Sequence, residues 1–266
     1  MAVAVAVAVA VAAGGLVSRT TIPAELVERA APVSLAAEKQ LPVLPAFESL
    51  LPRGLRRGSV VAVEGSSSLA LALVAAASVE GSWCAAVGRP ALGLVAASEL
   101  GIVLDRFPLV PAPHPSAGAG PGGWAWVVAT LLDAFDVVIA WPSACSAAVR
   151  PADARRLAAR ARERGSVLVV ASGAGTPGAG AAGAGGRGWP EVPDIRLAVA
   201  RPEWVGPGVG HGRLRGRRVE VVAGGRGAAA RQRRASLWLP APGGGVANAS
   251  DDVEEGALEV ADERVG

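Results

Sequence analysis

The sequence predicts an α/β protein with a mainly parallel sheet flanked by helices and a C-terminal antiparallel extension. Apolar runs of strand length alternate with helical patterns between residues 59 and 171, which favours parallel pairing through right-handed crossovers. Runs such as VVIA and VLVV are apolar at every position, as is typical of strands covered on both faces. After residue 188 strand-like runs follow one another with only short turns between them, which indicates antiparallel pairing.

The predicted elements of the parallel part alternate in a regular order. We expect strands at Ser59–Val63, Trp83–Val87, Phe107–Val110, Asp136–Trp141 and Ser166–Ala171. We expect helices at Leu69–Val79, Leu92–Leu100, Trp124–Ala134 and Pro151–Arg164. The last helix has clear ends, because a proline opens its first turn and Gly165 follows its final residue. The strands of the antiparallel extension are predicted at Ile195–Ala200, Arg218–Val222 and Ala235–Leu239.

Composition divides the chain into six segments. They are a low-complexity extension (1–17), a lead-in (18–50), a core (51–171), a flexible Gly/Ala-rich loop (172–188), basic strands that complete the sheet (189–240) and an acidic disordered tail (241–266). The Ala-Val repeat at the N-terminus has about a dozen apolar residues, whereas a membrane span needs about 20. We interpret it as an extension from an upstream start codon, with a signal segment as the alternative. We expect a cytoplasmic protein that does not associate with membranes.

Charge is distributed unevenly, although the formal net charge is only +3. Nine arginines stand between Arg201 and Arg234 against two acidic residues, and seven acidic residues stand between Asp251 and Glu263. Arginine almost completely replaces lysine, as a GC-rich genome would produce, so the arginine excess by itself is weak evidence for nucleic acid. The two cysteines and two histidines match no zinc-binding spacing, and we expect no metal site; these residues are Cys84, Cys145, His114 and His211.

A strand, a small polar turn and a helix at residues 59–79 have the order of the phosphate-binding motif GxxxxGK[ST]. The turn keeps a glycine and three hydroxyls, in the residues Glu64, Gly65, Ser66, Ser67 and Ser68. Yet the only lysine of the chain is Lys39, and Leu69 and Ala70 stand where the motif needs Lys and Ser/Thr. We therefore expect no bound cofactor and no catalytic residue, while weak anion binding at the helix N-terminus stays open.

The second element of a nucleotide site, a carboxylate at the end of an apolar strand, is also missing. The run Val137–Ala140 is followed by Trp141 and Pro142, whereas Asp133 and Asp136 precede it. In parallel sheets ligands bind at the carboxyl ends of the strands, so these two acids are expected at the wrong edge.

Several stretches resemble a known family. The segment LPRGLRRGSVVAVEGSSSLALALVAAAS resembles the start of the RecA-type core, with Gly54, Leu55 and Gly58 in the turn before the strand. Four further blocks resemble ImuA-type accessory proteins of bacterial translesion synthesis, so that the resemblance covers roughly residues 41–240. These blocks are GSWCAAVGRPALGLVAASELGIVLDRFPLVPAP, WAWVVATLLDAFDVVIAWP, RPADARRLAARARERGSVLVV and RRASLWLP.

The resemblance implies a RecA-like (P-loop NTPase-type) fold and a place in DNA-damage-induced mutagenesis. The partners that it implies are an ImuB-type, Y-family-like protein and a DnaE-type polymerase subunit. We expect a non-catalytic adaptor that uses a degenerate nucleotide fold as a docking platform. The alternatives are a divergent RecA-like DNA-repair ATPase that takes its lysine or arginine from a neighbour, and a regulatory binding protein unrelated to DNA.

The basic segment Arg201–Pro240 is the predicted surface for a partner or for DNA. The residues proposed for it are Arg213, Arg215, Arg217, Arg218, Arg231, Arg233, Arg234 and Trp238. Trp238 is the candidate partner anchor, with a packed core tryptophan as the alternative. No aromatic residue lies between Gly206 and Ala235, so this stretch itself offers nothing on which bases could stack.

Overall fold

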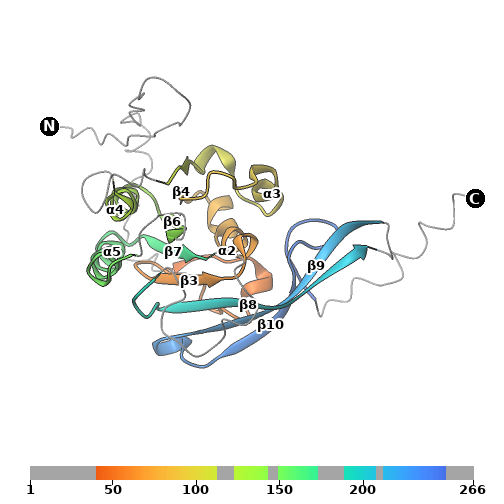
Figure 1. The fold of residues 1–266 in the computed structure, drawn as a ribbon. Coiled ribbons are helices and arrows are strands. Elements are labelled where there is room, and N and C mark those ends of the chain that lie inside the picture. Colours follow the sequence, from red (N-terminus) through yellow and green to blue (C-terminus); the bar gives the residue numbers. More distant parts are fainter. Residues whose placement is uncertain (1–39, 113–122, 143–148, 173–188, 208–211, 250–266) are drawn as a thin grey trace, which may run out of the picture.

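The computed structural model describes residues 40–112, 123–142, 149–172, 189–207 and 212–249. It is an α/β structure built on a nine-stranded mixed sheet with the order β11-β10-β9-β8-β3-β7-β6-β4-β5, together with a small two-stranded sheet, β1-β2. Helices cover both faces of the parallel half of the large sheet (Figure 1). The predicted fold class, a mainly parallel sheet flanked by helices with an antiparallel extension, is confirmed at this level.

The parallel half centres on β3 (Val60–Glu64), which pairs in parallel with β7 on one side and β8 on the other. The other parallel strands are β4 (Cys84–Val87), β5 (Leu109–Val110), β6 (Val137–Ala140) and β7 (Val167–Ala171). Every residue of β4, β6 and β7 is buried, as their uninterrupted apolar runs predict.

Four α-helices within the described ranges cover the two faces of this half of the sheet. One face packs on α2 (Ser67–Val79) and α3 (Leu94–Glu99), and the other on α4 (Trp124–Ala134) and α5 (Pro151–Arg164). The bounds of α4 and α5 are those predicted. In α5 the signals that set them are visible, since Pro151 opens the helix and Gly165 closes it with φ of 71°.

The chain enters the core earlier than composition suggests. The strands β1 (Gln40–Leu41) and β2 (Leu55–Arg56) pair with each other, and the 3₁₀ turn η1 (Pro45–Phe47) between them buries Phe47 completely. Gly54 has φ of 67°, and a Cβ there would lie 2.3 Å from the carbonyl oxygen of Leu41. The predicted boundary at residue 50 therefore falls within a packed turn that only a glycine can close.

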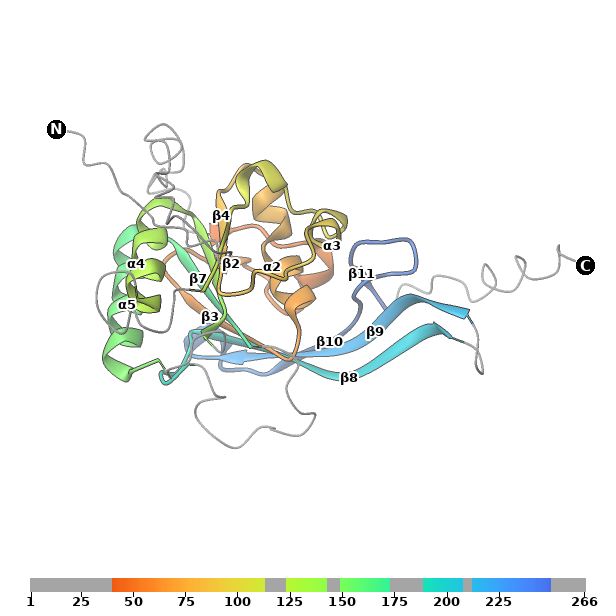
Figure 2. The same ribbon diagram turned by 45° about the horizontal axis from the view of Figure 1, so that its top comes forward.

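The antiparallel extension consists of β8 (Ile195–Pro207), β9 (Gly212–Gly225), β10 (Arg233–Trp238) and β11 (Ala247–Asn248). The strands β8 and β9 are longer than predicted, and they form a ribbon that projects beyond the helices (Figures 1 and 2). Two further 3₁₀ turns are η2 (Leu104–Arg106) and η5 (Gly227–Ala229). The strand β11 was not predicted at all.

The predicted start of a disordered tail at residue 241 is wrong for residues 241–249. Ala241 and Ala249 are buried, and the Ala249 N–H donates to the Ser236 carbonyl at 2.9 Å. This stretch has the glycines and few apolar residues of a tail, yet it supplies the edge strand β11 beside β10. Residues 250–266, 1–39 and 173–188, on which the other tail, extension and loop predictions fall, lie outside the described residues.

None of the helices within the described ranges is long and apolar enough to cross a lipid bilayer. Cys84 is fully buried in β4, as predicted, and burial raises the pKa of its thiol to about 12. That thiol is therefore protonated and enclosed at neutral pH.

A buried ion pair fixes β2 to the parallel strands. Arg57 donates to Asp136 at 2.7 Å, and their side chains are only 16% and 11% exposed. The second carboxylate oxygen of Asp136 accepts the Trp83 N–H at 3.0 Å, which also ties the start of β4 to β6.

We predict that Asp136→Ala lowers the free energy of unfolding by roughly 3–5 kcal/mol, because it leaves the Arg57 cation buried without a partner. Chemical denaturation followed by circular dichroism measures this. The matched control is Glu191→Ala, which removes an exposed ion pair with Arg155 and should cost less than about 1 kcal/mol. Equal losses in the two variants would contradict the structural role given to Asp136.

Candidate functional site

The degenerate phosphate loop lies between β3 and α2, at the carboxyl edge of the parallel strands. Only Gly65 and Ser66 separate the two elements, because β3 extends to Glu64 and α2 already begins at Ser67. Gly65 turns the chain with φ of 83°. A phosphate cradle needs a longer arch whose N–H groups point inward, as the four residues between the glycines of GxxxxGK[ST] provide. The predicted helix start at Leu69 was therefore two residues late, and the turn is shorter than predicted.

Ser66 is the N-cap of α2. Its Oγ accepts the Leu69 N–H at 3.2 Å, and the residue is 4% exposed. The hydroxyl thus satisfies one of the free N–H groups that an anion would otherwise use at a helix N-terminus. Glu64 pairs with Arg196 of β8 at 3.3 Å, so the acid that follows β3 is also engaged within the chain.

Arg217 of β9 extends its side chain to the same loop. It donates from Nη2 to Ser66 Oγ at 3.0 Å and from Nε to the Leu239 carbonyl at 2.9 Å. Its guanidinium also lies 5.2 Å from the ring centroid of Trp204 in β8. Burial lowers the pKa of this guanidinium, which is held by neutral acceptors and an aromatic ring.

The far end of β6 has no acidic group. Trp141 follows the strand and is 1% exposed, and its backbone N–H donates to the Val87 carbonyl at 3.0 Å. The guanidinium of Arg89 lies 6.0 Å from the Trp141 ring centroid. The position where a nucleotide site would hold magnesium through a carboxylate is thus filled by a buried indole.

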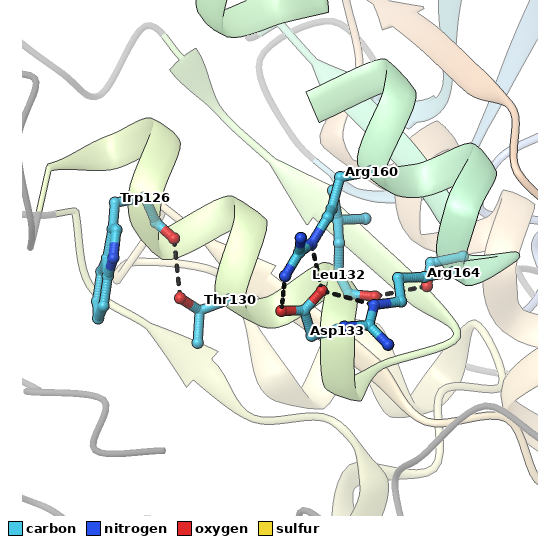
Figure 3. Close-up of polar contacts among 7 residues, drawn as sticks. Trp126, Thr130, Leu132, Asp133, Arg160 and Arg164 are labelled. Atoms are coloured by element: carbon cyan, nitrogen blue, oxygen red, sulfur yellow. Dashed lines mark hydrogen bonds and ion pairs between the residues drawn. The ribbon is translucent and has the colours of Figure 1, made fainter. Parts of the chain in front are cut away.

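The two acids near β6 serve the structure at the opposite edge, as predicted. Asp136 forms the ion pair with Arg57 described above. Asp133, in the last turn of α4, lies between two arginines of α5 (Figure 3): Arg160 Nε donates to it at 2.6 Å and Arg164 Nε at 3.0 Å. These contacts link α4 to α5. Arg155 and Arg156 also pair with acids, Glu191 at 3.7 Å and Asp153 at 3.9 Å, so four of the five α5 arginines have a partner within the chain.

The predicted basic surface is divided between the two faces of the sheet. Arg217 shares a face with Val219 and Val221, which pack on the α2 side. Arg213 and Arg215 are exposed and lie within a register shift near the end of the ribbon, where strand alternation does not assign a face. Arg218 and Arg234 lie on the opposite face, where Arg234 pairs with Glu220 at 3.1 Å. Arg233 stands opposite Ala223 and therefore lies on the α2 side. Arg231 is exposed and precedes β10. The sequence could not show this division.

The two tryptophans of the extension also lie on different faces. Trp238 is half-buried and stands opposite Arg218 on one side and Ala247 on the other. Trp204 is 48% exposed and stands opposite Arg217. Sequence reasoning found no aromatic among the β9 arginines, and the one that joins them comes from the neighbouring strand. Only the strand register could have indicated it.

The described residues contain no group of three or more His, Cys, Asp or Glu side chains placed to hold a metal ion. His114, His211 and Cys145 lie outside the described ranges. Around Ser66 the described residues thus provide hydrogen bonds, the guanidinium of Arg217 and the Glu64–Arg196 ion pair.

Comparisons with known proteins match the core of the chain. Residues 49–178 match the family model described as the MT3502 N-terminal domain. Over 122 residues the chain is 37% identical to the uncharacterized protein Rv3395c of Mycobacterium tuberculosis (strain ATCC 25618 / H37Rv), a match covering 46% of this chain and 55% of the relative. The chain thus spans about half the length of this curated relative. The family match includes β3, the loop and β7, whereas β8, β9 and Arg217 lie beyond it.

Proposed function

We propose that the protein is a non-catalytic adaptor with a RecA-like fold that acts in DNA-damage-induced translesion synthesis in the cytoplasm. The arrangement of the parallel strands supports the fold assignment. The loop after the central strand β3 meets the N-terminus of α2 at the carboxyl edge of the sheet, which is where doubly wound α/β proteins bind ligands. The resemblance of residues 41–240 to ImuA-type proteins supplies the biological setting.

The observation that carries the non-catalytic part of the proposal is the contact between Ser66 and Arg217. A nucleotide fold that has lost its lysine could still hold a phosphate on free N–H groups. Here the loop is two residues long and Ser66 Oγ is already bonded to the Leu69 N–H and to Arg217. The chain's own arginine occupies the space before α2, and the fold is left to act through its outer surfaces.

The partners follow from the resemblance alone: an ImuB-type, Y-family-like protein and a DnaE-type polymerase subunit. Trp238 is the proposed anchor for one of them, because it lies half-buried near the edge of the sheet, between Ala247 of β11 and the exposed Arg218 of β9. Large aromatic side chains of this kind dominate many protein interfaces.

We predict that the purified protein does not hydrolyse ATP, with or without single-stranded DNA and magnesium, because the loop holds neither a lysine nor a magnesium ligand. Release of phosphate measures this. Turnover of about 1 per second or more would contradict the proposal. If that turnover were lost in Ser67→Ala or Ser68→Ala, the divergent DNA-repair ATPase would be the better description.

We predict that Trp238→Ala weakens binding to the purified ImuB-type or DnaE-type protein of the same genome by about 2 kcal/mol, or roughly thirtyfold. Calorimetry of the full chain measures this. Trp126→Ala is the matched control, since Trp126 is an exposed tryptophan that lies on α4 (Figure 3) and not in the extension. Absence of binding by the unaltered protein, or equal weakening by both changes, would contradict the proposed docking role.

A further inference from the structure

The projecting part of the β8–β9 ribbon carries an aromatic ring and three arginines. Trp204 is paired directly opposite Arg217, and side chains of directly opposed residues share a face. Arg213 and Arg215 follow on β9 within a second register shift, where their backbone lies against Gly206 of β8. We call the surface formed by Trp204, Arg213, Arg215 and Arg217 the basic ribbon face. The ribbon that carries it projects beyond the helices (Figure 2).

A β-bulge creates this arrangement. Val199 pairs with Val221 on the α2 side, and simple alternation from there would place Glu203 on that side and Trp204 on the other. The register shifts between Ala200 and Glu203, which reverses the alternation. The aromatic therefore joins the arginines, and the carboxylate of Glu203 is turned to the far face, opposite Arg218.

The bulge carries backbone strain. Arg201, which lies inside it, has φ of 47°, the only positive value among the non-glycine residues of the described chain. A residue held in this region costs on the order of 1–3 kcal/mol, and such costs are concentrated at functional sites. The strained residue, Arg201, lies in the bulge that reverses which faces the Trp204 and Glu203 side chains occupy.

The basic ribbon face has positive charge without local compensation. The two carboxylates of β8 and β9, Glu203 and Glu220, both lie on the opposite face, where Glu220 pairs with Arg201 and Arg234. Within the described residues, Arg213 and Arg215 are exposed and take part in no ion pair. Two exposed guanidinium groups without an acidic partner, close together on one strand, suit a polyanion such as a phosphate backbone.

The exposed indole of Trp204 indicates which class of polyanion the surface would bind. Trp204 is 48% exposed, and Arg217 holds its ring from one side at 5.2 Å. A fixed, half-exposed ring beside cations is the arrangement on which unpaired bases stack, whereas bases in a duplex are not available for such contact. An acidic peptide would use the arginines but would gain little from the ring.

We propose that the basic ribbon face binds single-stranded nucleic acid, with Arg213 and Arg215 contacting phosphates and Trp204 stacking on a base. In this proposal Arg217 positions the ring, since its Nε and Nη2 bond the Leu239 carbonyl and Ser66 Oγ and so hold its guanidinium beside Trp204. The inference goes beyond the adaptor role and does not depend on it, because nucleic acid is a different ligand on a different surface from Trp238.

Fluorescence anisotropy of labelled oligo(dT) and oligo(U) with the full chain tests the proposal. We expect binding that weakens with salt, and Arg213→Ala/Arg215→Ala should reduce the log–log salt slope by about 1.4, or about 0.7 for each phosphate that is no longer neutralised. The matched control is Arg218→Ala/Arg231→Ala, which removes the same charge from exposed positions outside the face and should leave the slope nearly unchanged. Trp204→Ala should weaken binding roughly tenfold, and Trp204→Phe should restore most of it.

Circular dichroism of each variant confirms that the fold is intact before binding is compared. Equal loss in the two arginine pairs would overturn the proposal, because the attraction would then come from net charge alone. Binding of poly(glutamate) as tightly as oligo(dT), with Trp204→Ala silent, would also overturn it and assign the face to an acidic protein. No binding of either oligonucleotide at low salt would overturn it outright. Failure in any of these ways leaves the ATP and Trp238 measurements unaffected.

Discussion

The guanidinium of Arg217 joins three parts of the molecule: the loop before α2, the turn after β10 and the β8–β9 ribbon. It bonds Ser66 Oγ and the Leu239 carbonyl, and it supports the Trp204 ring. Each contact belongs to a different stretch of sequence, so this side chain adds a second link between the extension and the parallel core, besides the pairing of β8 with β3. The proposed inactivity of the loop depends on where this cation is held, and so does the support of the Trp204 ring that the β-bulge turns toward it.

The surroundings of the Arg217 guanidinium show how the chain itself engages the loop before α2. Burial lowers the pKa of Arg217, which shows that the surroundings disfavour its charge. Neutral acceptors and the indole face compensate in part, as a phosphate would in an active nucleotide site. The sequence lacks the lysine of a phosphate-binding motif, and at this loop the chain holds an arginine in its own hydrogen bonds, which supports the proposed adaptor over an ATPase.

Elements with strong local signals could be predicted from the sequence. The bounds of α4 and α5 follow from their flanking glycine, proline and apolar patterns, and the missing lysine and the acids at the wrong edge were visible as residue identities. The remaining features depend on contacts across strands. The bulge at Arg201 reverses which residues share a face of the ribbon. The strand β11 is defined by its backbone pairing with β10. Neither has a signature within its own segment, so the division of the arginines and the role of Trp204 could not be predicted.

A double-mutant cycle between Ser66 and Arg217 measures the central contact most directly. Ser66→Ala, Arg217→Met and the double variant are unfolded in denaturant, and the coupling free energy is taken from the four stabilities. The structure predicts a favourable coupling of about 1.5 kcal/mol, since the hydrogen bond involves a charged and partly buried donor. If the two single changes are additive within about 0.5 kcal/mol, the account is contradicted, because Arg217 and Ser66 would then not interact in the folded protein.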